Sequence, residues 1–236
     1  ELEPEGITVS VGGEIGEVGK ENSTESELRA YLDNFNELLD KELKGSTSIS
    51  KISIQTGTSH GGVPGPDGKV VDVNLDFECL ESLSRIARQD YGLAGAVQHG
   101  ASTLPSDLFN KFPELETAEI HLATDFQNMI YDNELFPEDF KKEIYNHLRK
   151  KFAPEKKETD TDEQFIYKTR KKGFGEFKSK FWDLSKEIRT EIGSHLQRKV
   201  EHLFTQLKVE GTLEITKNTT PIIKTPPTLA QEIASA

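Results

Sequence analysis

The sequence predicts an α/β protein with a parallel sheet, and three observations support this fold class. Short β-branched runs alternate with longer amphipathic stretches between residues 7 and 131. Several of these runs stop on a His or Glu, which is how strands of a (β/α) barrel present reactive groups at their C-terminal ends. The length of 236 residues also suits one domain of this type, which takes about 250 residues.

Four strands are expected in chain order. Residues 7–11 alternate apolar and hydroxyl side chains, and residues 51–55 alternate in the same way. Residues 93–98 and 119–123 are short and mostly apolar. Because each strand precedes a helical pattern, the order βαβαβαβα predicts parallel strands.

Two amphipathic helices are expected between these strands. Residues 25–43 and 77–91 carry apolar side chains at helical spacing. The hydroxyl residues that begin at Ser23 can cap the first helix, and Asn74 or Asp76 can cap the second.

Beyond residue 136 the pattern becomes helical and more polar. One helix is predicted over 137–151 and one or two more over 161–207, with an interruption at 173–175. We therefore divide the chain into a barrel segment at 1–135, a C-terminal helical region at 136–207 and an extended tail at 208–236.

Four strands raise a difficulty, because a closed parallel barrel needs eight. The predicted fold is therefore a (β/α)8 TIM barrel of which this chain supplies about the second half plus C-terminal helices. The start at Glu1, without an initiator Met, also suggests the C-terminal part of something longer.

Composition excludes several classes of partner. The net charge of -12 disfavours nucleic acid, whose binding needs clustered Lys and Arg. No stretch of about 18 apolar residues offers a membrane span. A single cysteine, Cys79, excludes an internal disulfide, and no signal-peptide pattern occurs, so a cytoplasmic location is expected.

Four motifs, each at a predicted strand end and in the same order, resemble the class II (metal-dependent) fructose-bisphosphate and tagatose-bisphosphate aldolases. They are Glu14-Ile-Gly16, Gly57-Thr-Ser-His-Gly61, His99-Gly-Ala-Ser102 and His121-Leu-Ala-Thr-Asp125. The similarity covers roughly residues 7–131 and continues weakly into 161–207.

The resemblance implies a metal site. His60 and His99 would be two of three ligands, and Glu14 matches a carboxylate that binds the metal in an alternative position; a carboxylate bonded to loop amides is the alternative interpretation of Glu14. The third ligand and an acid/base Asp would lie in the absent first half of the barrel. Zinc, or another divalent metal, is the implied cofactor, with a monovalent cation as a second one.

The resemblance also implies a phosphate site. Gly61, Gly100 and Ser102 would surround a phosphate, backed by the N-terminus of a helix after residue 103, while Thr124 and Asp125 would hold other polar atoms of the substrate. An ordinary turn with a capping serine is the alternative at 100–102. A basic residue from the run 168–172 can reach a second phosphate in the family, although this run also suits a solvated helix start.

Three positions depart from the family pattern. Glu21 is the one acid left where relatives carry a catalytic pair, so a solvated carboxylate is an equal interpretation. His121 replaces an asparagine that contacts the dihydroxyacetone-phosphate part of the substrate. Ala101 replaces a glycine and would add a methyl group beside the phosphate loop.

These observations predict a zinc-dependent aldolase, a lyase of carbohydrate metabolism such as glycolysis, acting on a ketose bisphosphate. A divalent metal can stabilise, as a Lewis acid, the enediolate of dihydroxyacetone phosphate. A metal-dependent sugar or sugar-acid epimerase of the same superfamily and a non-catalytic stabilising subunit of an aldolase are the alternatives. Expected partners are a phosphorylated sugar, the N-terminal half or a partner chain that supplies it, and further copies in a dimer or larger homo-oligomer.

Overall fold

The computed structural model describes residues 9–16, 21–57, 63–67, 70–71 and 75–220. Its main sheet has four strands, namely β1 (Gly12–Glu14), β2 (Lys51–Ile54), β5 (Ala96–Gln98) and β6 (Glu119–Ile120). They lie in the order β1-β2-β5-β6, and every pair is parallel. The predicted parallel α/β arrangement is confirmed. A closed barrel needs more strands than these four, so the barrel stays a prediction.

The strand boundaries differ from those expected. The first strand begins at Gly12, where the chain lies beside Lys51, so the range 7–11 was wrong in its described part. A small antiparallel pair, β3 (Val63–Pro64) and β4 (Val70–Val71), was not predicted. Strands this short give too little alternation for a period of two to be recognised.

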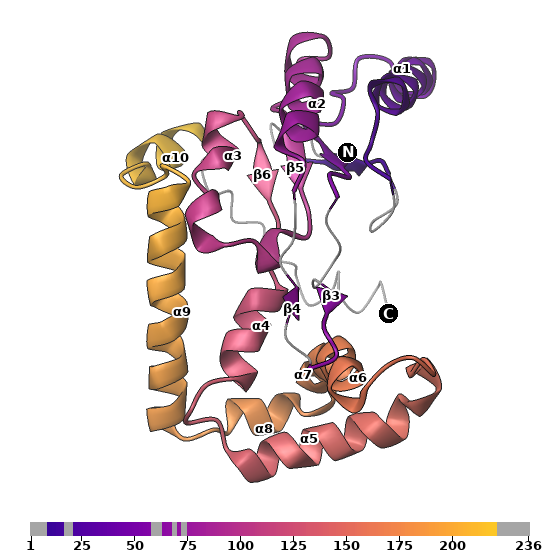
Figure 1. Ribbon diagram of the computed structural model, residues 1–236. Coiled ribbons are helices and arrows are strands. Elements are labelled where there is room, and N and C mark those ends of the chain that lie inside the picture. Colours follow the sequence, from indigo (N-terminus) through magenta and orange to yellow (C-terminus); the bar gives the residue numbers. More distant parts are fainter. Residues whose placement is uncertain (1–8, 17–20, 58–62, 68–69, 72–74, 221–236) are drawn as a thin grey trace, which may run out of the picture.

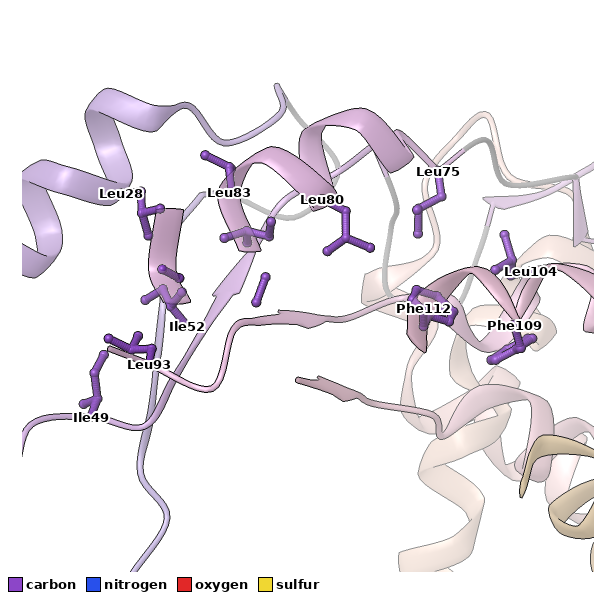
Figure 2. Close-up of a cluster of buried hydrophobic side chains, with 14 of the residues drawn as sticks. Leu28, Ile49, Ile52, Leu75, Leu80, Leu83, Leu93, Leu104, Phe109 and Phe112 are labelled. Carbon is purple, nitrogen blue, oxygen red and sulfur yellow. The ribbon is translucent and has the colours of Figure 1, made fainter. Parts of the chain in front are cut away.

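Helices α1 (Glu25–Glu42) and α2 (Phe77–Gln89) pack side by side against the sheet (Figure 1). Thr24 caps α1 in a capping box with Glu27, and Asp76 caps α2. Their apolar stripes meet the strands in one buried cluster, whose members include Leu28, Leu32, Leu80, Leu83, Ile52 and Ile54 (Figure 2). Each fully buried aliphatic side chain contributes about 1.5–3 kcal/mol, so this cluster fixes the helices on the sheet.

The segment between β5 and β6 corrects the prediction of a helix directly after residue 103. It forms two 3-10 turns, η2 (Ala101–Thr103) and η3 (Ser106–Leu108), and the one-turn helix α3 (Lys111–Glu114). Pro105 is the physical reason, because the residue before a proline is driven out of the helical region. Leu104 accordingly has extended angles, with φ -72° and ψ 140°.

The C-terminal region is helical, as expected, but more divided. Its elements are α4 (Thr124–Tyr131), α5 (Glu138–Lys151), η4 (Ala153–Glu155), α6 (Asp162–Thr169), η5 (Arg170–Lys172), α7 (Gly173–Glu176), α8 (Lys178–Trp182), α9 (Lys186–Gln206) and α10 (Leu213–Thr219). The predicted helix at 137–151 is confirmed as α5. The tail predicted as extended from residue 208 contains α10, which corrects that prediction. No described helix has the length and hydrophobicity that a bilayer span requires.

A second buried cluster centres on Tyr131, which is fully buried among aromatic rings. Its hydroxyl donates to the carbonyl of Arg170 at 2.9 Å. The Arg170 guanidinium pairs with Asp132 at 2.8 Å and also lies over the rings of Tyr131 and Tyr167. These contacts fasten η5 to the end of α4.

Helix α9 runs along one side of the molecule (Figure 1) and joins the two clusters. Leu203 belongs to the cluster under the sheet helices, whereas Ile192 belongs to the cluster around Tyr131. Lys199 lies between them and pairs with Asp125 of α4 at 2.9 Å. Helix α9 therefore packs against both the sheet region and the C-terminal helices.

Ser84 of α2 fixes the position of β5. Its buried hydroxyl donates to the Glu116 carbonyl at 2.9 Å and accepts from the Ala96 amide at 3.0 Å. Gly95 has φ +137°, and a Cβ there would lie 2.8 Å from the Ser84 hydroxyl, so the backbone passes as closely as a glycine allows. This contact sets the start of β5 and the turn that leads into β6.

Replacement of Ser84 by Ala should lower the free energy of unfolding by about 1–3 kcal/mol, because two buried backbone groups lose their partner. Urea denaturation monitored by circular dichroism measures this. Ser194→Ala is the matched control, since that hydroxyl donates to the Thr190 carbonyl of its own helix. Equal stability of the Ser84→Ala variant and the parent would contradict the role given to this hydroxyl.

Candidate functional site

The register of the sheet brings the predicted polar tips together. Glu14, Ser53, Val97 and Glu119 form one row across the four strands. Gln98 pairs with Ile120, so the next residues, His99 and His121, lie side by side at the carboxyl edge. Their rings are stacked, with centroids 4.4 Å apart and planes inclined by 27°.

Glu14 reaches from the end of β1 to His99. The Glu14 Oε1 atom lies 3.2 Å from His99 Nδ1. The His99 side chain is 20% exposed and that of Glu14 is 50% exposed, so the pair sits at an accessible rim. A ligand that enters from solvent can reach both groups.

The backbone at His99 is held by a buried amide. Gln98 is fully buried, and its Nε2 donates to the His99 carbonyl. Its Oε1 accepts from the Thr56 hydroxyl at 2.7 Å. A side chain of β5 and a residue after β2 thus fix the turn that carries His99.

The Glu119 carboxylate contacts two side chains that can donate to it. Its carboxylate accepts from Lys51 and also contacts His121 Nε2. The Lys51 ammonium, and secondarily His121, lowers the pKa of Glu119, while partial burial opposes this shift. The carboxylate is therefore ionised and holds His121 in place.

The donors present suit a zinc ion in part. Two ligands at tetrahedral bond lengths of about 2.0–2.1 Å lie roughly 3.3 Å apart, which agrees with the observed distance between His99 Nδ1 and Glu14 Oε1. In the described ranges no three His, Cys, Asp or Glu side chains converge in a way that could hold a metal. His60 lies outside the described residues. The described residues therefore supply two candidate zinc ligands, His99 and Glu14.

The Gly100–Ser102 turn forms one wall of the site. Gly100 has φ 73° and ψ 8°, a left-handed conformation that favours glycine. The Ser102 hydroxyl accepts from the Ala123 amide at 2.9 Å and keeps its own proton for an acceptor. Ala101 is fully buried in the cluster under the sheet helices, which corrects the expectation that its methyl group lies beside the phosphate loop.

A cavity of about 380 Å³ opens beside this turn. Its lining includes His99, Ser102, His121, Thr124, Gln127 and Lys171. Thr124 is the first residue of α4, and the first amides of a helix have no partner within it. The exposed Lys171 adds a cationic side chain from η5. The cavity thus combines amides, hydroxyls and a positive charge, which together suit an anion.

The other predicted site residues are Asp125, Glu21 and Gly61. Asp125 pairs with Lys199 and lines a separate cavity of about 690 Å³, so the structure separates it from Thr124. Glu21 is exposed. Gly61 lies outside the described residues.

Sequence reasoning missed the pair of Lys51 and Glu119 and the contribution of Gln127. Lys51 and Glu119 lie on strands that are not neighbours, and only the register reveals their approach. Lys171 belongs to the basic run 168–172, but nothing in the spacing of that run distinguishes it from Arg170, which is buried.

A comparison with family models gives one match. The model described as Fructose-bisphosphate aldolase class-II matches residues 5–206, which include every element from β1 to the last residue of α9. A comparison with curated protein sequences gives no match.

Proposed function

The chain belongs to the class II fructose-bisphosphate aldolase family, an aldolase-type lyase, and on that basis we propose that it cleaves or forms a ketose bisphosphate with the help of a divalent metal. Zinc is the metal we favour, because imidazole and carboxylate donors suit it. The observation that carries this proposal is the approach of His99 Nδ1 to Glu14 Oε1, 3.2 Å apart at the carboxyl edge of the sheet.

His99, Glu14 and His60 are the proposed ligands within this chain. When bound, the metal would supply Lewis-acid stabilisation of the negative charge that aldol cleavage leaves on the ketone fragment. The stacked His121 closes one side of the site, and Gln98 holds the His99 backbone. Glu21 is proposed as the loop acid that assists proton transfer, which requires its loop to close over the site.

The Gly100–Ser102 turn and the start of α4 are the proposed phosphate site. The Ser102 hydroxyl can donate to a phosphate oxygen while it still accepts from Ala123. Thr124, the first residue of α4, lines the same cavity, and Lys171 supplies the opposing charge. Gly61 would add an amide from the neighbouring loop. Asp125 can join this site only if its carboxylate leaves Lys199.

The outer strands of the described sheet support a proposal about assembly. Parallel strands occur almost only in sheets that are covered on both faces, and their open edges invite pairing. We therefore propose that β1 and β6 pair with strands from the N-terminal half of the same protein or from a partner chain. That half would also bring the third metal ligand and the acid/base Asp. We also propose that the protein forms a homo-oligomer and is located in the cytoplasm.

The protein purified together with its N-terminal half should contain about one equivalent of zinc, and the His60→Ala, His99→Ala double variant should contain almost none. Elemental analysis after exhaustive dialysis measures the metal content. His195→Ala is a matched control, because His195 pairs with Glu191 on α9 and lines a different cavity from His99. Full metal content in the double variant would refute the assignment of these ligands.

Loss of the Ser102 hydroxyl or the Lys171 charge should weaken phosphate binding. A hydrogen bond to a charged group contributes about 1.5–3 kcal/mol, so Ser102→Ala should lower kcat/KM for a phosphorylated sugar roughly 10- to 150-fold. Lys171→Met should raise KM and reduce its dependence on salt.

The control for Lys171 is Lys168→Met, because Lys168 pairs with Asp160 and does not line the cavity. If Ser102→Ala leaves kcat/KM within about twofold for all phosphorylated sugars, the phosphate site has been placed wrongly.

The proposed assembly predicts that residues 1–236 expressed alone are unstable and inactive. Supplying the N-terminal half, in the same chain or as a separate one, should restore metal binding and aldol cleavage. Size-exclusion chromatography and a coupled aldol-cleavage assay measure the two effects. A soluble, monomeric and active 236-residue protein would disprove the assembly.

A further inference from the structure

We propose that Lys51, Glu119 and His121 form a positioning chain that sets the orientation of the His99 ring. This inference rests on the proposed role of His99 as a metal ligand. None of the three residues is offered as a ligand or as a catalytic group. Their role is to hold the ligand in the plane that directs its Nδ1 atom toward Glu14.

The register places all the members on one face of the sheet. Residues in one row of a parallel sheet point the same way, so Glu14 and Glu119 share a face with Ser53 and Val97. Lys51, His99 and His121 lie two residues from members of that row and therefore point to the same face. Ile52, Ile54 and Ala96 point the other way and belong to the apolar cluster that contains α1 and α2.

The first link crosses a strand. Lys51 is on β2 and Glu119 is on β6, with β5 between them. The Lys51 side chain is only 19% exposed, so its long stem lies along the sheet and its ammonium reaches the Glu119 carboxylate. A partly buried charge that is fixed by an opposite charge leaves Glu119 little freedom to change its conformation.

The second link fixes the plane of an imidazole. The other oxygen of Glu119 contacts His121 Nε2, so the ring of His121 is held at its edge. Its face lies against the His99 ring, with centroids 4.4 Å apart. Once the His121 ring is held in this way, the His99 ring cannot turn about its own χ2 torsion without breaking the stack.

The chain ends at the metal donor. With its ring plane set by His121 and its backbone held by Gln98, His99 directs Nδ1 to within 3.2 Å of Glu14 Oε1. An asparagine at position 121, which the family resemblance leads one to expect, has no ring to stack. The histidine therefore brings a constraint on ligand geometry that an asparagine cannot supply.

Zinc affinity in a double-mutant cycle tests the proposal. Competition with a chromophoric chelator should show that Glu119→Gln and His121→Asn each weaken zinc binding about tenfold, since residues that orient a metal ligand typically contribute 10- to 100-fold. The double variant should also lose about tenfold, because both changes break the same chain. His121→Phe keeps a flat ring but loses the contact with Glu119, so it should also weaken zinc binding about tenfold.

His195→Asn is the matched control, because it removes a histidine that pairs with Glu191 at 2.7 Å on α9. It should leave zinc affinity within twofold. Thermal unfolding of every variant should stay close to that of the parent, which separates positioning from loss of fold. Losses that multiply to about a hundredfold in the double variant, or no loss in either single variant, would overturn the proposal.

Nitrogen NMR of the His99 ring in metal-free protein separates this proposal from the proposed function. The parent should show one ring tautomer, and Glu119→Gln and His121→Asn should show averaged signals. If the parent shows the fixed tautomer but binds no zinc, the metal function fails and the positioning chain stands. If the parent binds zinc but its His99 signals do not respond to either variant, the positioning chain is refuted and the metal function stands.

Discussion

The parallel register of β1, β2, β5 and β6 is the constraint on which the site depends. It aligns Glu14 with Ser53, Val97 and Glu119 and brings His99 and His121 level with each other. A shift by one residue on any strand would turn its polar tip to the opposite face, toward the apolar contacts with α1 and α2. The helices oppose such a shift, because their buried leucines fit only the face that carries Ile52 and Ile54. The hydrophobic cluster therefore determines where the polar groups meet, although it contains none of them.

A second set of contacts couples the site to the C-terminal helices. Arg170 is buried, pairs with Asp132 and lies against two tyrosine rings. Because Arg170 is anchored in this way, its neighbour Lys171 is carried to the cavity beside His99. Helix α9 joins both buried clusters, and Lys199 ties it to α4 through Asp125. The position of the Lys171 charge at the cavity thus depends on packing among the C-terminal helices.

The two departures from the family pattern at the strand ends have opposite physical consequences. Ala101 lies in the apolar cluster, where its methyl group adds buried surface and leaves the anion turn open. His121 stays at the rim, stacks on His99 and brings Glu119 and Lys51 into the surroundings of the proposed metal site. The small change at Ala101 is therefore accommodated in the core, whereas the larger change at His121 extends the polar network.

The sequence by itself determined the parallel α/β class, two helices predicted at 25–43 and 77–91 and observed at 25–42 and 77–89, and the strand ends that carry Glu14, His99 and His121. These features are local, because periodicity, capping and turn residues act over a few neighbouring positions. Only the tertiary structure decided that Lys51 reaches Glu119, that Asp125 turns to Lys199 and that Lys171, not Arg170, faces the cavity. Those outcomes depend on register and on packing between distant segments. The pattern of a single sequence does not reveal these contacts. Several side chains of the same chemical type could make each one, and only the fold selects among them.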